Sequence, residues 1–107
     1  MLLTNTEFIP GYKITAQYGL VSGSTVRAKH AGRDLMASFK NFVGGELTAY
    51  TELLEESRKE ANERMITQAQ RLGANAIINV RYETSAITAG AAEVYAYGTA
   101  VKAERME

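Results

Sequence analysis

Residues 72–82 of this chain read LGANAIINVRY, and they mark a change from a helical to an extended pattern. Gly73 follows the last apolar residue of a helical repeat, and glycine most readily takes the left-handed backbone angle that ends a helix. Over 76–84, β-branched residues alternate with polar ones, which is typical of a strand. The apolar face of that strand would carry Ile78, Val80 and Tyr82.

The segment before Gly73, residues 46–72, predicts one long amphipathic helix. Glu55 with Lys59, and Glu60 with Arg64, are acid-then-base pairs four apart, each worth roughly 0.2–0.5 kcal/mol. The opposite side of the helix carries an apolar stripe at helical spacing. Its members are Leu47, Tyr50, Leu54, Ala61, Met65, Ala69 and Leu72.

Three segments nearer the N-terminus complete the pattern. Residues 12–20 alternate between apolar and polar, which predicts a half-buried strand that ends in a bend or bulge at Gly19 and Gly23. Apolar spacings of three and four over 31–43 predict a short helix. Residues 1–10 predict an irregular or edge segment.

A third strand is predicted over 93–102, after a loop of small residues over 85–92. This strand is apolar on both faces, a pattern typical of strands that are covered on both sides. Tyr95, Tyr97 and Val101 lie on the face that neither predicted helix covers, and their exposure would sacrifice about 1.5–3 kcal/mol each. We therefore expect copies of the chain to associate into a homo-oligomer.

Length and charge narrow the classes of function. The chain has 107 residues, enough for a single domain over 1–107. Its 12 basic and 12 acidic side chains balance, which argues against nucleic acid or a membrane as partner. The sequence contains no cysteine, which excludes a thiolate metal site, and no apolar run of spanning length, so a cytoplasmic protein is expected.

A series of short motifs resembles the YbjQ-like family. The resemblance runs from about residue 10 to residue 102, in the same order and spacing. Its motifs are Gly19 through Gly23, Gly32-Arg33-Asp34, Gly44-Gly45-Glu46, Tyr50-Thr51-Glu52, residues 72–82 and Gly98-Thr99-Ala100-Val101.

That resemblance implies a fold and an assembly. The fold is α+β, in two layers: a three-stranded antiparallel sheet of order 1-3-2, covered by one long and one short helix, as in the dodecin-like group. Members of the family assemble as pentameric rings. The family carries a heavy-metal-binding label and no established activity.

Five polar side chains are candidates for a binding site at a subunit boundary. Asp34 is the only aspartate of the chain, and a short carboxylate near a helix start accepts backbone N–H bonds. Arg33 beside it suits two-pronged pairing with a carboxylate. The structural alternative is a cap, or an ion pair between subunits that involves Arg58 or Glu52. The full set is Arg33, Asp34, Tyr50, Glu52 and Arg58.

The residue types give limited support to a metal or cofactor. His30 is the only histidine, and a metal site normally needs three or four ligands, so five copies around a ring axis offer the only route to a His30 site. The glutamates of 52–63 suit a hard cation, although a solvated, ion-paired helix face is the simpler interpretation. Flavin is disfavoured because the chain has no tryptophan to stack on it.

The residues contain no catalytic motif, so an enzyme is not favoured. We expect a ring-forming protein that binds a metal ion or small ligand at subunit boundaries or in an axial channel. An enzyme with an inter-subunit site that uses Arg33, Asp34, Tyr50 and Glu52, and an interaction scaffold, stay as alternatives.

Overall fold

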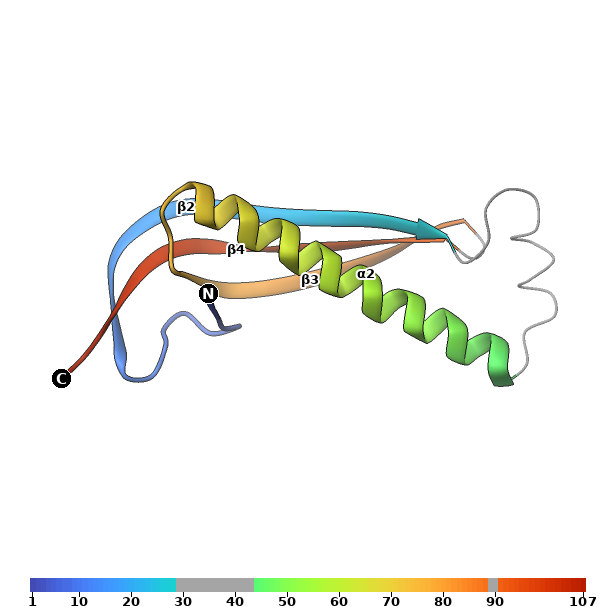
Figure 1. The fold of residues 1–107 in the computed structure, drawn as a ribbon, viewed down its shortest axis with the longest axis horizontal. Coiled ribbons are helices and arrows are strands. Elements are labelled where there is room, and N and C mark those ends of the chain that lie inside the picture. The colour runs from blue at the N-terminus through green and yellow to red at the C-terminus, as the bar shows by residue number, and fades with distance from the viewer. Residues whose placement is uncertain (29–43, 89–90) are drawn as a thin grey trace.

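The computed structural model describes residues 1–28, 44–88 and 91–107, and for residues 28, 44–50 and 87–88 it describes the backbone only. The elements in chain order are β1 (Leu2–Leu3), β2 (Tyr12–Ala28), α2 (Gly44–Arg71), β3 (Ala76–Thr88) and β4 (Ala91–Arg105), shown in Figure 1. The predicted short helix over 31–43 lies outside the described residues.

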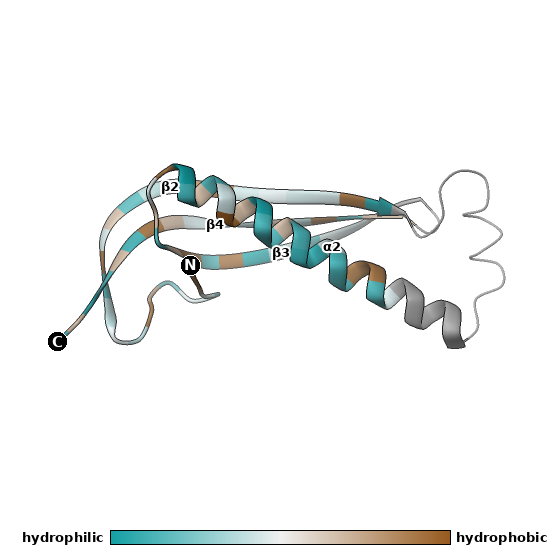
Figure 2. Ribbon diagram, viewed as in Figure 1, coloured by the Kyte–Doolittle hydropathy of each residue, from teal (hydrophilic) through white to brown (hydrophobic). Residues whose placement is uncertain are grey.

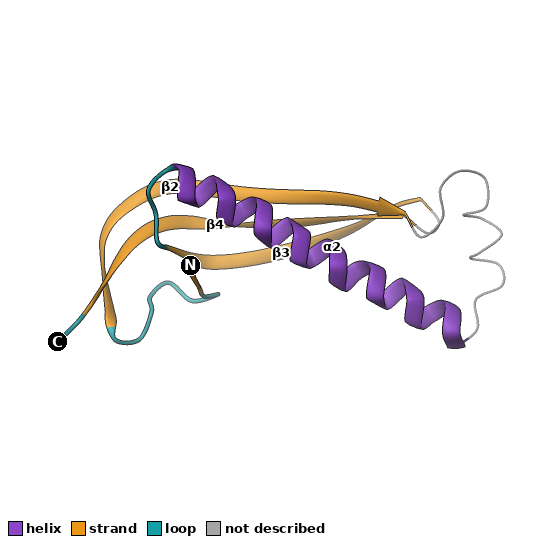
Figure 3. Ribbon diagram, in the orientation of Figure 1, coloured by secondary structure: helices purple, strands orange, loops and turns teal. Residues whose placement is uncertain are grey.

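The strands form one sheet of order β1-β3-β4-β2, and α2 lies across one face of it, so the α+β class is confirmed (Figure 3). β4 runs antiparallel to both β2 and β3, which confirms the expected order of the three long strands. The prediction of a purely antiparallel, three-stranded sheet is wrong, because β1 pairs with β3 in parallel. The N–H groups of Leu2 and Thr4 donate to the oxygens of Asn75 and Ile77 at 3.2 and 3.1 Å, and this pairing draws the predicted edge segment into the sheet.

The strands are longer than their sequence patterns predict. β2 continues past Leu20 to Ala28, and the predicted loop over 85–92 is strand as far as Thr88 and again from Ala91. β4 supplies a ladder partner for each of these extensions, for example Ala91 for Ala28. Pairing with a neighbouring strand therefore overrides the weak strand preference of serine, glycine and alanine.

The helix ends where the glycine predicts. Gly73 has a φ of 87°, its N–H donates to Gln70 O at 3.0 Å, and the N–H of Ala74 donates to Ala69 O at 3.1 Å. These two bonds form a Schellman motif, which satisfies the last carbonyls of α2. The reversal then directs the chain into β3.

The main core lies between α2 and the sheet. Ala61, Met65 and Ala69 of the predicted stripe are fully buried against the sheet, while Leu54 packs at the margin. Leu72 is 46% exposed, so its place in the stripe is wrong. Figure 2 shows the hydrophilic residues of α2 that alternate with this stripe. The sheet contributes Val21, Ile77, Val80, Val94, Ala96 and Ala100 to the core.

Gly23 sets how closely α2 approaches β2. A Cβ at this position would lie 2.3 Å from Ala61 O and 2.6 Å from Met65 N, so only glycine fits beneath the helix backbone. The predicted bulge near Gly19 is confirmed, since the pairing with β4 shifts register between Gln17 and Gly19. Gly23 itself lies inside the continuing strand and marks the helix contact.

A second, smaller cluster lies on the opposite face of the sheet. Val101 is fully buried there with Ile78. Ile9, from the segment before β2, packs against this cluster together with Tyr12 and Ile14 at the start of β2. The expectation that Val101 lacks cover within its own chain is therefore wrong. The chain itself covers one half of this face.

The predicted apolar face of the strand over 76–84 is also wrong. Ile78 belongs to the smaller cluster and Val80 to the main core, on opposite sides of the sheet. The cause is a bulge, since Asn79 has a φ of 53° and the pairing with β4 shifts register between Ile78 and Arg81. One additional residue reverses the faces of the alternating pattern.

Candidate functional site

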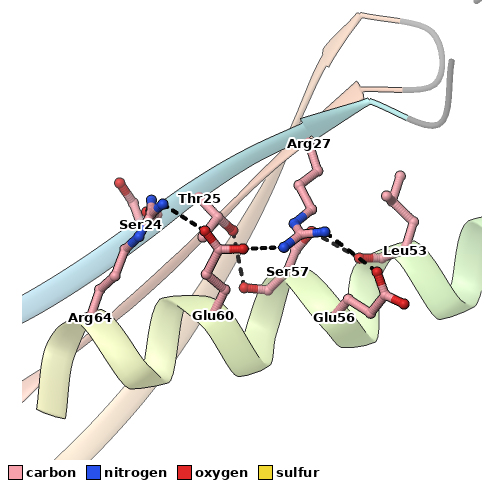
Figure 4. Close-up of polar contacts among 8 residues, drawn as sticks. All are labelled: Ser24, Thr25, Arg27, Leu53, Glu56, Ser57, Glu60 and Arg64. Carbon is pink, nitrogen blue, oxygen red and sulfur yellow. Dashed lines mark hydrogen bonds and ion pairs between the residues drawn. The ribbon is translucent and has the colours of Figure 1, made fainter. Parts of the chain in front are cut away.

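Charged side chains from α2 and β2 form one polar network, shown in Figure 4. Arg27 on β2 pairs with Glu60 on α2, and its other terminal nitrogen lies 3.4 Å from Glu56 Oε2. Arg64 pairs with the second oxygen of Glu60 at 2.6 Å, which confirms the predicted pair four residues apart. The ion pair between Arg27 and Glu60 joins elements far apart in the sequence, so no local residue spacing predicts it.

The pairing favours the charged forms of Arg27 and Glu60. The hydrogen bond from Arg27 lowers the pKa of the Glu60 carboxyl, and the positive charges of Arg27 and Arg64 lower it further against a partial desolvation. The same hydrogen bond raises the pKa of Arg27. A carboxylate with a lowered pKa is a poor proton acceptor near neutrality, so Glu60 is not suited to general acid–base chemistry.

Two shallow grooves border this network along α2. One, of about 370 Å³, is lined by Glu63, Thr67 and Arg71 together with Glu60 and Arg64. The other, of about 460 Å³, is lined by Arg27, Glu56, Lys59, Glu60 and Glu63. Both mix acidic and basic groups, and Glu60, which lines both, is already paired with Arg27 and Arg64. The network therefore joins α2 to β2 and gives no evidence of a vacant ligand site.

The predicted binding residues are only partly within the described structure. His30, Arg33 and Asp34 lie outside the described residues, and Tyr50 lies on α2 where only the backbone is described. Glu52 and Arg58 are both exposed on α2. They are six residues apart, about 9 Å along the helix axis, so these two do not form a site on their own. The set stays a prediction.

A region of exposed aromatic and apolar side chains, interspersed with polar neighbours such as Ser22, Ser24 and Glu83, lies on the face of the sheet opposite α2, in the half nearer the end of β2. We call it the tyrosine face and define it by Leu20, Val26, Tyr95 and Tyr97. The rings of Tyr95 and Tyr97 lie 5.3 Å apart and are partly exposed, while Leu20 and Val26 are 70% and 63% exposed. The alternation of β4 predicted that the two tyrosines would lack full cover, but no sequence pattern placed Leu20 or Val26 on the same face.

The described donors do not fit a heavy-metal site within one chain. In the part of the chain that the structure describes, no three His, Cys, Asp or Glu side chains gather closely enough to hold a metal ion. Met65 is fully buried in the core, and Met1 and Met106 are separate, exposed terminal residues. Across the same described segments, no helix has both the length and the apolar character to cross a bilayer.

The fold and the residues together define a small α+β protein of one sheet and one long helix, and comparisons with known proteins identify its family. A family model described as "Putative heavy-metal-binding" matches residues 1–104. A UPF0145 protein of Hahella chejuensis is 62% identical over 104 residues, which cover 97% of this chain and all of that protein. The chain therefore belongs to the YbjQ-like family, as its motifs indicate.

Two further comparisons bear on length and fold. A UPF0145 protein of Psychrobacter arcticus is 59% identical over 105 residues, and the match spans 66% of that protein's length. A crystal structure of a protein of unknown function from Pediococcus pentosaceus superposes with a TM-score of 0.67 at 19% identity, covering 97% of this chain and 98% of that one. The second likeness supports the fold alone.

Proposed function

We propose that copies of this chain assemble into a ring, pentameric in size, that binds a small ligand at its subunit boundaries or in its axial channel. The observation that carries the proposal is the tyrosine face, where large apolar side chains stay in contact with water on a single chain. Burying such side chains is worth about 1.5–3 kcal/mol each when burial is complete. A further copy is the commonest partner for a surface of this kind.

The shape of the chain supports the same proposal. Its principal extents are 56 × 24 × 15 Å, so the sheet and its helix form a long, thin slab. On the face opposite α2, the half nearer the start of β2 is covered by Ile9 together with Tyr12 and Ile14. The half nearer the end of β2 retains its apolar side chains without cover from any described segment.

We expect the ligand to be a small organic molecule that stacks on the tyrosine rings, or an anion that accepts hydrogen bonds from their hydroxyls. A metal ion would need donors pooled from several copies, because one chain supplies no cysteine and a single histidine, His30. The proposal concerns assembly and binding alone.

Mass measurement tests the assembly. Native mass spectrometry and light scattering at micromolar concentration should give a multiple of the 11.7 kDa chain, and a monomer would overturn the proposal. Tyr97→Glu should dissociate the assembly, because it introduces a charge on the tyrosine face. Thr67→Glu adds the same charge at an exposed position on α2, and it should leave the mass unchanged.

The same sample tests the ligand. Elemental analysis and mass spectrometry of denatured protein should detect a stoichiometric passenger, which Tyr97→Glu should lose. Titration with zinc, copper, nickel and calcium gives a second measurement, since binding to the native state must raise the melting temperature. A ring that carries no passenger and shows no shift with metals or with small anions would contradict the binding part of the proposal.

A further inference from the structure

The sheet has two outer edges, and they differ in how they are covered. On the β3 side, β1 and the segment after it cover the edge as far as Val80, whose N–H donates to Thr4 O at 2.9 Å. The side chain of Arg81 then reaches back to Asn5 O at 2.7 Å. Beyond this point residues 81–88 pair with β4 but have no strand on their outer side within the described chain, and the outer side of β2 likewise has none along its length.

The two open edges match each other in direction and level. β2 and β3 are both antiparallel to β4, so they run the same way. Ser24 and Glu83 both pair with Tyr95, and they therefore lie at one height on the sheet. The matching continues on either side of this pair: Ser22 and Arg81 share Tyr97, and Val26 and Ser85 share Glu93.

Two side chains of α2 occupy the β2 edge. Gln68 Oε1 accepts a hydrogen bond of 2.7 Å from the N–H of Ser22, and Arg64 Nη1 donates one of 2.6 Å to the main-chain oxygen of Ser24. In an antiparallel strand, the N–H and C=O of one residue point to the same side, and these two residues point away from β4. Gln68 and Arg64 thus fill two successive positions that a neighbouring strand would use.

We propose that the outer edge of β2 is a docking surface for residues 81–88 of β3 in a second copy, and that Gln68 and Arg64 close this edge on the lone chain. The inference rests on the proposed assembly and names the surfaces that join. On docking, the two side-chain bonds are exchanged for backbone bonds between strands, a recurring mode of strand addition. Unprotected edges associate readily, which explains why a lone chain needs this cover.

Geometry favours a second copy as the occupant. The open edge of residues 81–88 runs in the same direction as β2 and lies at the same level, so the edge strand of a second copy can meet β2 in parallel along the stretch that Gln68 and Arg64 occupy. The contact uses different surfaces on the two copies, so it repeats from copy to copy, and a ring results when the rotation closes.

Cysteine cross-linking tests which edges join, and the natural chain has no cysteine to interfere. Val26→Cys combined with Ser85→Cys should give disulfide-linked multimers up to the full ring on mild oxidation. Within one chain the two positions lie on either side of β4, too far apart for a disulfide, so such a bond can form only between copies. Val26→Cys with Thr67→Cys should give none. Native mass spectrometry of the same samples distinguishes a failure of the edge pairing from a failure of the proposed assembly. An intact ring without Val26–Ser85 cross-links would overturn the edge pairing and leave the assembly standing, whereas a monomer would overturn both.

A second measurement tests whether the hydrogen bond from Ser22 N–H to Gln68 Oε1 competes with docking. Gln68→Ala removes the bond that competes with docking, so the concentration at half-assembly should fall by roughly twofold to tenfold, the equivalent of one hydrogen bond. Thr67→Ala is the matched control on the adjacent exposed position. An unchanged or higher half-assembly concentration in Gln68→Ala would show that Gln68 does not hold the edge closed.

Discussion

The hydroxyl of Thr25 on β2 donates a hydrogen bond of 3.0 Å to the main-chain oxygen of Ser57 on α2, and both residues are buried. Ser57 in turn donates from its own hydroxyl to Leu53 O at 2.8 Å. This chain of two bonds brings polar groups into the contact between helix and sheet with each hydroxyl satisfied. It lies beside the Arg27–Glu60 pair, so α2 is fixed to β2 by both buried and partly exposed contacts.

Thr25→Val tests the buried bond. Valine keeps the shape of threonine and removes the donor, so the free energy of unfolding should fall by about 0.5–1.5 kcal/mol. Thr67→Val is the control, because Thr67 makes the same kind of bond to a helix carbonyl, Glu63 O, from an exposed position. Denaturant titration of both variants measures the difference, and equal losses would contradict a special role for the buried bond.

Gly23→Ala should be among the most damaging small changes in the chain. The new methyl would meet backbone atoms of α2 rather than a movable side chain, so the helix must shift, at a cost of about 1–3 kcal/mol or more. Ser24→Ala, at the neighbouring position on the opposite face, should change the free energy of unfolding by less than about 0.5 kcal/mol. A melting temperature for Gly23→Ala close to that of the natural chain would refute the close approach.

Met65→Ala tests the main core. Met65 is fully buried, and truncation leaves a cavity between α2 and the sheet, with a loss of about 2–5 kcal/mol. Met106→Ala removes the same atoms from a residue that is 53% exposed and should be nearly neutral. The comparison by thermal unfolding isolates burial from the chemistry of methionine.

The Arg27–Glu60 pair should make stability depend on pH. The pKa of Glu60 is lowered in the folded state by the hydrogen bond from Arg27, so the folded state binds this proton less readily than the unfolded state does. The stabilisation is present in full above the ordinary glutamate pKa and is lost as the pH falls through the lowered value.

Glu60→Gln should therefore be less stable than the natural chain at neutral pH, and the two should converge in acid. Melting temperatures at stepped pH and constant ionic strength measure this. Glu63→Gln, on the exposed surface one turn further, is the control and should follow the natural chain throughout. A constant gap between Glu60→Gln and the natural chain down to acid pH would contradict the assignment.

Local patterns predicted much of the architecture. Gly73 predicted the end of α2 to within one residue, since the left-handed angle is a property of glycine itself. The spacing of Ala61, Met65 and Ala69 predicted the buried side of the helix. The motifs between residues 10 and 102 identified the family, which the match over 1–104 confirms.

Local patterns failed wherever a distant segment decided the outcome. Nothing near Val101 indicates that Ile9, Tyr12 and Ile14 fold over it. The bulge at Asn79, which places Ile78 and Val80 on opposite faces, depends on pairing with β4 and on the N-terminal segment, since the Asn79 N–H donates to Thr6 O at 2.9 Å. The predicted binding set around Arg33 and Asp34 lies outside the described residues and stays a prediction.

The sequence by itself determined the class of elements, their order, and the helix stripe, because backbone preferences and the helical and strand periods act between near neighbours. Only the tertiary structure decided that Gly23 lies beneath α2, that Arg27 meets Glu60, and that Gln68 and Arg64 reach the β2 edge. Those contacts join residues 33 to 46 positions apart, and they form because packing of the helix on the sheet brings them within reach of one another.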